Sequence, residues 1–448
     1  MQHLVTPLLY TEVAEAGCVR RLPMFLRTVL GNPDLAQRVK SFSGRTIQSH
    51  WFQPSDYVGS LKRMMPRIID ISIWSPEDKV SIQTAIENAT KTFKLAYYTY
   101  PTRSDETFSR RWIKKIFKAS YFATWDTTVA LLLCLLPNLE VFRVQTFKDH
   151  RQHHRDGVAG FQFIMRILQS SKTTTGRLIL PRLRTADLSF RDCVLRKRLH
   201  YSLCHTLAPL KCFRYEVFPV MDTWKDRSHR CREADVNPAF VRTRLLSGLE
   251  QSVEELSIII RLLDPELLSK WRITKDTRLS HCGIGSLRDF TQLRVLKMTA
   301  RILIGNPAHD QYLANMSFED MMLRYKYIPE QENSFYQGLP SRLEALHIID
   351  CPNAVYGCIK RLLQTSFLPS TLKRIELTYT YPTRDREGRA LAAMNKWLAG
   401  ENAGWCLMFP GESFATKKYL ESLASEKGIT AIQRIDENYR DNKISTKW

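Results

Sequence analysis

The sequence lacks any apolar run long enough to cross a membrane. The longest run, VALLLCLL at 129–136, has eight residues, whereas a transmembrane helix needs about 20. We also expect no secretion signal, because Pro7, Glu12 and Glu15 interrupt the N-terminal stretch that such a signal would keep apolar. We therefore expect no membrane partner.

The sequence also lacks a C-x-x-C pair, although it contains ten cysteines. Most of them stand singly beside apolar residues, as Cys134 does in LLLCLL and Cys212 in LKCFRY. This usage is typical of a reducing compartment, where buried thiols serve as small apolar side chains. The cysteines thus predict a cytoplasmic or nuclear location, or both.

Signatures of catalysis are missing as well. The sequence has no G-x-S-x-G, no H-E-x-x-H and no kinase motif set. The stretch HCGIGS at 281–286 contains G-x-G, but lacks the third glycine of a dinucleotide-binding turn and the Lys-Ser/Thr of a phosphate loop. We expect no catalytic residues, no cofactor and no enzyme activity.

Two stretches hold potential metal ligands without the spacing of a metal module. HRQHHR at 150–155 could place three histidines on one helical face, but it is more typical of a solvated loop after a strand. The second stretch lacks tight ligand pairs, and its members are Cys193, His200, Cys204, His205 and Cys212. We expect no metal at either place.

Acidic residues are too few to balance the basic ones, since 45 Asp and Glu face 66 Lys and Arg and leave a net charge of +21. Such an excess is compatible with nucleic acid or an acidic protein surface as a partner. In SRRWIKKIFK, helical spacing places five basic residues opposite an apolar face: Arg110, Arg111, Lys114, Lys115 and Lys118. This basic face could dock an anionic partner, but the solvated outside of a packed helix is the favoured interpretation.

What the sequence does contain is a repeated phrase, L-x-x-φ-x-φ, in which φ is apolar and a leucine or proline often precedes. Its seven copies lie at 136–144, 180–188, 207–215, 251–258, 290–298, 339–348 and 368–377. The last two φ positions alternate with polar residues and so point to one face of a short strand, while the first lies in the preceding turn. Each copy exposes an apolar face that it cannot bury alone, so neighbouring copies must stack.

Helix-like segments lie between several of these phrases, at 161–170, 317–327 and 354–365. The alternation predicts an α/β fold, an irregular leucine-rich-repeat solenoid that is horseshoe-like, with strands on one side and helices on the other. The first apolar positions of successive phrases lie 27–50 residues apart, whereas leucine-rich repeats usually have about 20–29 residues. An ordinary α/β domain is therefore the alternative.

Terminal units of a solenoid are expected to differ from the rest, because they must cover its open ends. We expect a mainly helical linker and N-terminal cap at 21–125, the irregular repeats at 126–390, and a C-terminal cap and tail at 391–448.

The residue between the two strand φ positions of each phrase should point away from the core. These residues are Arg143, Asp187, Arg214, Ser257, Lys297, His347 and Glu376. We expect them to line a concave face that binds a protein, a role that needs no catalytic group. The identity of that protein cannot be derived from these residue types.

The N-terminal region carries a more specific pattern. LVTPLLYTEV at 4–13 precedes RLPMFLRTVLGNPDLAQRVKSF at 21–42. The sequence here resembles fungal F-box proteins with irregular leucine-rich repeats, whose F-box ends in a helix with LVxPLLYxxV and is followed by RLxxFLRTLxxNPxLAxxVxSL. The matching residues of the linker are Arg21, Leu22, Phe25, Leu26, Arg27, Thr28, Asn32, Pro33, Leu35, Ala36 and Val39.

The resemblance implies a substrate receptor of an SCF-type cullin-RING ubiquitin ligase. It identifies residues 1–20 as the remnant of an F-box C-terminal end, in which LVTPLLYTEV resembles the end of the final helix, and the remnant's marker residues are Leu4, Pro7, Leu8, Leu9 and Tyr10. The helices that hold the ligase adaptor would lie upstream of Met1, so we expect adaptor binding only if an F-box is present there. The alternative function is a basic protein that binds nucleic acid or another anionic surface, although nucleic acid is not the expected partner.

Overall fold

The structure is a computed structural model that describes thirteen stretches of the chain: residues 11–13, 21–45, 74–93, 107–117, 121–147, 162–169, 180–191, 210–218, 241–260, 283–304, 338–351, 354–379 and 417–435. These residues separate into two compact units. The first unit contains the described residues up to Arg214 together with 244–249, and the second contains 215–218, 241–243 and those from Glu250 onward.

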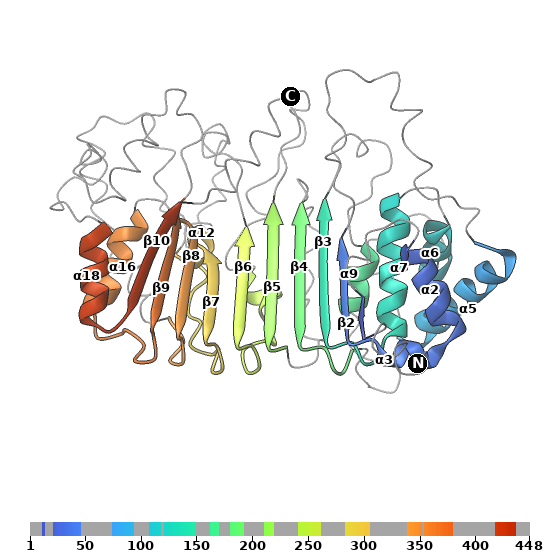
Figure 1. Cartoon of the computed structure of the whole chain (residues 1–448), viewed down its shortest axis with the longest axis horizontal. Helices are drawn as coiled ribbons and strands as arrows, with labels where there is room; N and C mark the ends of the chain where they lie inside the picture. The colour runs from blue at the N-terminus through green and yellow to red at the C-terminus, as the bar shows by residue number, and fades with distance from the viewer. Residues whose placement is uncertain are drawn as a thin grey trace, which may run out of the picture. The chain divides into compact units, whose positions relative to one another are not determined.

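Parallel strands form the centre of each unit, and they stand side by side in chain order (Figure 1). The strands of the first unit are β1 (Glu12–Val13), β2 (Ser41–Arg45), β3 (Val141–Phe147), β4 (Thr185–Arg191) and the start of β5 (Cys212–Phe218). Those of the second unit are β6 (Glu255–Ile260), β7 (Val295–Thr299), β8 (Ala345–Cys351), β9 (Arg374–Tyr379) and β10 (Thr430–Ile435). The predicted α/β class is confirmed, and the strands are parallel, whereas a leucine-rich-repeat solenoid stays a prediction.

The apolar positions of the seven phrases form the core beneath these strands. All 21 of them are buried, from Leu139, Phe142 and Val144 in the first phrase to Leu372, Ile375 and Leu377 in the last. Because side chains alternate along a strand, the last two apolar positions of each phrase point to the same face. The prediction that these positions form the core is confirmed.

The first apolar residue of the phrase closes a tight turn in front of the strand. Its backbone N–H donates to the carbonyl three residues earlier, at 3.3 Å from Leu139 to Leu136 and at 3.0 Å from Leu372 to Pro369. The carbonyl of the next residue then accepts two N–H groups from the neighbouring strand. Glu344, for example, accepts from Lys373 at 2.8 Å and from Arg374 at 3.1 Å. These turns align the strands at their N-terminal edge.

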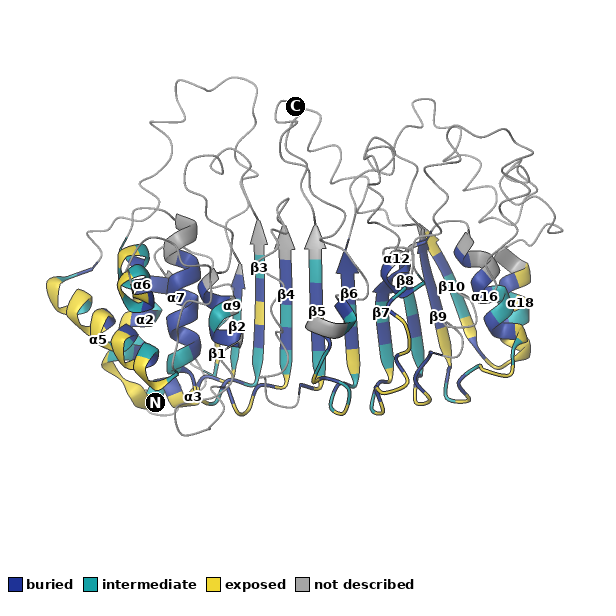
Figure 2. Ribbon diagram, turned by 180° about the vertical axis from the view of Figure 1, so that it is seen from behind, coloured by how far each residue is buried: buried dark blue, intermediate teal, exposed yellow. Residues whose placement is uncertain are grey.

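The helices of the first unit lie beside its first strands, β1 and β2 (Figure 1). They are α2 (Arg21–Gly31), α3 (Pro33–Arg38), α5 (Pro76–Thr92), α6 (Phe108–Ile116), α7 (Tyr121–Leu135) and α9 (Gln162–Gln169). The helix α7 is apolar along most of its length and is buried from Val129 to Leu133. Figure 2 shows that only the outer helices, α5 above all, expose much of their surface.

A buried aromatic and polar cluster joins α6, α7 and α9. Trp112 is fully buried, and its indole N–H donates to the Thr127 carbonyl at 3.0 Å. The ring of Phe163 lies 5.7 Å from that of Trp112. The carboxylate of Asp126 on α7 accepts from the N–H groups of Phe163 and Ile164, both at 3.0 Å. It thereby satisfies backbone donors that the first turn of α9 would otherwise leave unpaired.

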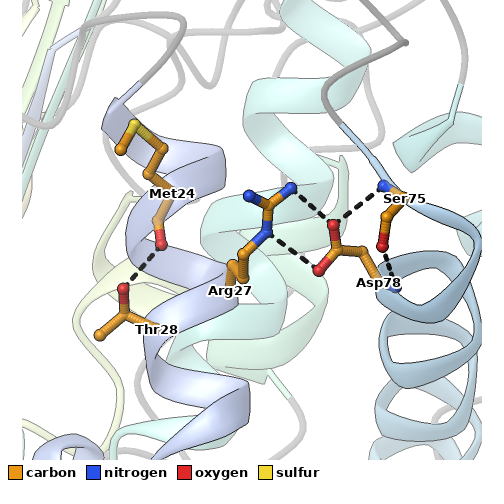
Figure 3. Close-up of polar contacts among 5 residues, drawn as sticks. All are labelled: Met24, Arg27, Thr28, Ser75 and Asp78. Carbon is orange, nitrogen blue, oxygen red and sulfur yellow. Dashed lines mark hydrogen bonds and ion pairs between the residues drawn. The ribbon is translucent and has the colours of Figure 1, made fainter.

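Residues that carry the family resemblance have clear structural roles in α2 and α3. Arg27 reaches from α2 to Asp78 on α5 with two guanidinium nitrogens, at 2.9 Å and 2.5 Å, and Ser75 closes a capping box with the same aspartate (Figure 3). Although burial raises the pKa of Asp78, hydrogen bonds from the Ser75 backbone and from Arg27 bring it below its ordinary value. Asn32 caps α3 by accepting from the Leu35 N–H.

The first strand differs from what the resemblance implies. Glu12 and Val13 form β1 and not the last turn of a helix, because they pair in parallel with Ser41 and Phe42 of β2. The Thr11 carbonyl accepts the N–H groups of Lys40 and Ser41 at 3.0 Å and 3.1 Å, which continues the alignment seen between the later strands.

Three helices of the second unit are described: α12 (Ala300–Leu303) follows β7 directly, α16 (Ala354–Gln364) follows β8 after a short connection, and α18 (Lys417–Glu426) precedes β10. A short π-helical turn, η5 (Val241–Leu245), extends across the division between the units. The helix α12 contacts β7 and β8; it lies behind them in Figure 1 and in front of them in Figure 2. The opposite face of these strands therefore carries the polar residues of each phrase.

One of the sequence motifs explains a close backbone contact in this unit. A Cβ at Gly283 would lie 2.4 Å from the Leu303 carbonyl oxygen at the end of α12, and the next residue, Ile284, donates its N–H to the Ile302 carbonyl at 2.8 Å. Gly285 has a φ of +79°, which L side chains rarely adopt. Both glycines of HCGIGS thus allow a local backbone conformation that other residues would disturb.

The last strand, β10, was not expected from the sequence. It pairs in parallel with β9 in register from Thr430 opposite Arg374 to Ile435 opposite Tyr379. Its core-facing positions hold Ala431 and Gln433, of which the glutamine is buried. The predicted boundaries at residues 20, 125 and 390 stay predictions. Within the described residues, no helix is long and apolar enough to span a bilayer.

Candidate functional site

The outward-facing polar residues of the phrases form a row in each unit, because the strands pair in exact sequence register. In the first unit Ser43 lies opposite Arg143, and Arg143 lies opposite Asp187. In the second unit Ser257 is followed by Lys297, His347 and Glu376 on successive strands. We call these residues, with Arg214, the outward row. It contains all seven residues that the sequence placed on the binding face.

Two arginines flank one aspartate in the first unit. Arg143 and Arg214 are exposed, whereas Asp187 is partly buried between them, with an Nη1–Oδ2 distance of 4.0 Å to Arg214. Burial raises the pKa of Asp187, and the charges of Arg214 and Arg143 oppose that rise. This part of the outward row thus presents two cations around a single anion.

The second unit carries a tighter cluster around Glu376, which is only 8% exposed. Arg374 donates to its Oε2 at 2.9 Å, and Arg434 lies 2.7 Å from its Oε1. His347 Nε2 lies 3.7 Å from Oε1 of the same carboxylate and 2.8 Å from the Thr378 hydroxyl. The glutamate is therefore covered by polar neighbours on β8, β9 and β10, and we call these five residues the Glu376 cluster.

His347 is neutral at neutral pH in this environment. Burial, the main cause, and the charges of Lys297, Arg434 and Arg374 together lower its pKa to about 4, against the opposing effect of Glu376. The imidazole therefore adds no charge to the cluster. Its Nε2 and the Thr378 hydroxyl form one neutral hydrogen bond.

The cluster contains a hydroxyl, an imidazole and a carboxylate, but not in the order that nucleophilic catalysis needs. In a catalytic triad the base contacts the nucleophile with one ring nitrogen and the acid with the other. Here the same nitrogen, Nε2 of His347, faces both Thr378 and Glu376, and Thr378 is itself buried. This geometry is suited to holding the side chains in place and not to activating the hydroxyl.

On β4, β8 and β9 the accessible part of the outward face lies toward the N-terminal ends of the strands, whereas on β10 it includes Arg434, which lies opposite Thr378. Two residues after the outward row, Ile349 on β8 lies opposite Thr378 on β9, and both are buried. Ser189 has the corresponding place on β4 and is buried too. On β4, β8 and β9 a partner would therefore contact the outward row and the residues before it.

A second row of charges runs along the N-terminal edges of the strands, and the sequence analysis missed it. The residue after the first apolar position is charged in every phrase: Glu140, Arg184, Lys211, Glu254, Arg294, Glu344 and Lys373. The sign alternates over four strands of the second unit, and Arg294 and Glu344 form an ion pair at 2.8 Å. In the first unit Lys40 lies 3.5 Å from Glu140. Opposite charges on neighbouring strands stabilise one register.

The predicted basic face on α6 is divided in the structure. Arg110 and Lys114 are exposed, whereas Arg111 and Lys115 are partly buried, and Arg111, Lys114 and Lys115 all have interaction partners. Phe108, Trp112 and Ile116 supply the buried side of the helix. Some predicted residues lie outside the described residues: Lys118, Leu4, Pro7, Leu8, Leu9, Tyr10, His150, His153, His154, Cys193, His200, Cys204 and His205.

The described stretches contain no group of three or more His, Cys, Asp and Glu side chains that could hold a metal ion. Cys212, from the second potential ligand stretch, lies at the start of β5 as a partly buried thiol. Comparison of the chain with family models, with curated proteins and with solved structures gave no match.

Proposed function

We propose that the chain is a non-enzymatic protein-binding repeat domain that holds a partner on the outward row of its strands. The observation that carries this proposal is the register of that row: Lys297, His347 and Glu376 lie on adjacent strands, directly opposite one another. Adjacent strands lie about 4.8 Å apart, so side chains from several strands can contact one segment of a partner.

The rigidity of the strands supports the proposal. Each strand that carries a phrase is anchored by buried apolar residues on its other face, such as Leu346 and Ile348 on β8, which are fully buried. Outward side chains on such a scaffold lose little further backbone freedom when a partner binds, and preorganisation of this kind favours affinity. Which protein binds then depends on how well its own residues fit the outward row.

Site-specific photo-crosslinking tests the proposal directly. A photoreactive amino acid is placed at position 143 or 257, on the outward row of either unit, and at the exposed control positions Asn88 on α5 and Lys427 after α18. We expect a partner to be captured from each outward position and from neither control. Capture from the controls alone, or from all four positions equally, would contradict the proposal.

The family resemblance extends the proposal to a substrate receptor of an SCF-type ubiquitin ligase. Tagging the native gene at its 3′ end keeps any residues that precede Met1 in the expressed protein. We expect the cullin and its adaptor to co-purify with that protein. If the outward row captures its partner but no adaptor co-purifies, the ligase role fails and the binding role remains.

A further inference from the structure

The Glu376 cluster has an excess of positive charge at a defined place on the second unit. Glu376 contributes one negative charge, whereas Arg374 and Arg434 contribute two positive charges. Lys297 adds a further positive charge from the neighbouring outward-row position. Since the imidazole of His347 is neutral, the net charge of these groups is positive.

The two arginines are held by the glutamate and are still accessible. Arg374 and Arg434 each reach the carboxylate through Nη2, at 2.9 Å and 2.7 Å, and their side chains are 49% and 53% exposed. A guanidinium has five N–H donors, so each arginine retains donors beyond its contact with Glu376. The buried carboxylate thus fixes the position of two exposed cations in advance.

Stability alone does not account for this arrangement. Burying a carboxylate costs free energy that ion pairs often only just offset, and apolar side chains of similar volume usually stabilise a fold as well or better. One arginine would neutralise Glu376, but the structure supplies two, on different strands. Arginine forks fit carboxylates in a two-point geometry, and a second anion would balance the remaining charge.

We propose that Arg374 and Arg434 form an anion site for carboxylate side chains, and that the protein bound on the outward row presents an acidic segment to β8–β10. This inference rests on the proposed function and specifies the chemistry of the partner. Within the part of the chain that the structure describes, the other charged groups that act on His347 are Lys297 on β7, Arg374 and Glu376 on β9 and Arg434 on β10. Because three of these four are cations, the electrostatic field also favours an anion here.

Binding of a fluorescent hexaglutamate peptide to the full chain, at about 150 mM salt, tests the site. The double variant R374Q/R434Q removes both cations, and the triple variant R374Q/E376Q/R434Q also removes the carboxylate that the double variant leaves buried without partners. The control is Arg342→Gln, because Arg342 belongs to the same unit and bonds Gln292 at 3.0 Å, away from the cluster. Thermal unfolding shows which variants remain folded.

We expect both cluster variants to weaken hexaglutamate binding by about tenfold or more, since hydrogen bonds to charged groups contribute about 1.5–3 kcal/mol. Arg342→Gln should leave binding unchanged. Histidine NMR signals, with that of His347 assigned through His347→Gln, should show a higher pKa for His347 in the peptide complex.

The inference is wrong if the triple variant folds and binds the peptide like the wild type, or if Arg342→Gln weakens binding equally. The second result would mean that the overall positive charge attracts the peptide. These failures are distinct from failure of the proposed function, because crosslinking from positions 143 and 257 does not depend on the cluster.

Discussion

Arg294 and Glu344 form a two-point ion pair across the N-terminal edges of β7 and β8. The Arg294 Nε lies 2.8 Å from Oε1 of Glu344, and Nη2 lies 3.1 Å from Oε2. The hydrogen bond from Arg294, aided by the charges of Arg294 and Lys373, lowers the pKa of Glu344 against a smaller effect of burial. The pair belongs to the row in which Glu254, Arg294, Glu344 and Lys373 alternate in sign.

Reversing one charge of this row should weaken the pairing of three strands. Glu344→Lys places a cation between Arg294 and Lys373, so we expect a lower unfolding temperature. The double variant R294E/E344R restores the attraction within the two-point pair but sets like charges against Glu254 and Lys373, so it should recover only part of the loss. Thermal unfolding with the exposed α18 variant Glu426→Lys as a control measures both effects. An equal loss from Glu426→Lys would show that net charge, and not the pair, is responsible.

A methyl group at Gly283 should strongly disturb the second unit. Because its Cβ would lie 2.4 Å from the Leu303 carbonyl oxygen, the backbone must move, and we expect Gly283→Ala to lower the free energy of unfolding by about 1–3 kcal/mol. Gly31 has nothing within 4 Å of a Cβ and ends α2. Gly31→Ala should therefore be neutral or slightly stabilising. Urea unfolding compares the two variants. Equal stability of Gly283→Ala and Gly31→Ala would contradict the close approach of Gly283 to the Leu303 carbonyl.

Removing the Asp126 carboxylate should release the start of α9. Asp126→Ala leaves the N–H groups of Phe163 and Ile164 without their acceptor in a buried place, at a cost of about 2 kcal/mol. Hydrogen exchange should quicken in α9 and stay unchanged in α16 of the other unit. If exchange quickens equally in both helices, the effect is global and the capping role is not supported.

The stability of the second unit should depend on pH through His347. Its folded pKa of about 4 lies below the ordinary value of 6.5, with burial as the main cause. The unfolded chain therefore binds a proton more readily, so the stabilisation is fully present above about pH 6.5 and is lost as the pH falls toward 4. His347→Gln should flatten this part of the curve by on the order of 2 kcal/mol.

Urea unfolding at several pH values measures that difference. Carboxylates elsewhere in the chain titrate in both proteins and cancel in the comparison. Parallel curves for the wild type and His347→Gln would mean that His347 has an ordinary pKa in the folded protein.

The strands with a full phrase could be predicted, because a leucine in the turn followed by two alternating apolar residues leaves one orientation for the strand. The outward row follows from the same alternation. By contrast, β10 has Ala431 and Gln433 at its core-facing positions, so no apolar alternation indicates a strand. Arg434 was missed with it, and the Glu376 cluster could not be assembled without that residue.

The short strand β1 could not be predicted either, since two residues are too few to show an alternation of apolar and polar side chains. The row of charges at the strand edges was visible in the sequence, where a charged residue follows the first apolar position of all seven phrases. Its meaning depends on pairing, because residues 29–50 positions apart become neighbours only once the strands of the second unit align.

That row places a charge at the start of each phrase strand of the second unit, with a sign opposite to that of its neighbours. A strand in the second unit finds its neighbour through the turn carbonyl and a charge of opposite sign, both located at its first residues. The number of residues between one strand and the next therefore does not influence the alignment, and the phrases of this chain do lie at very unequal intervals. Segments between strands can gain or lose residues over evolution while the outward row, and with it the proposed binding face, keeps its register.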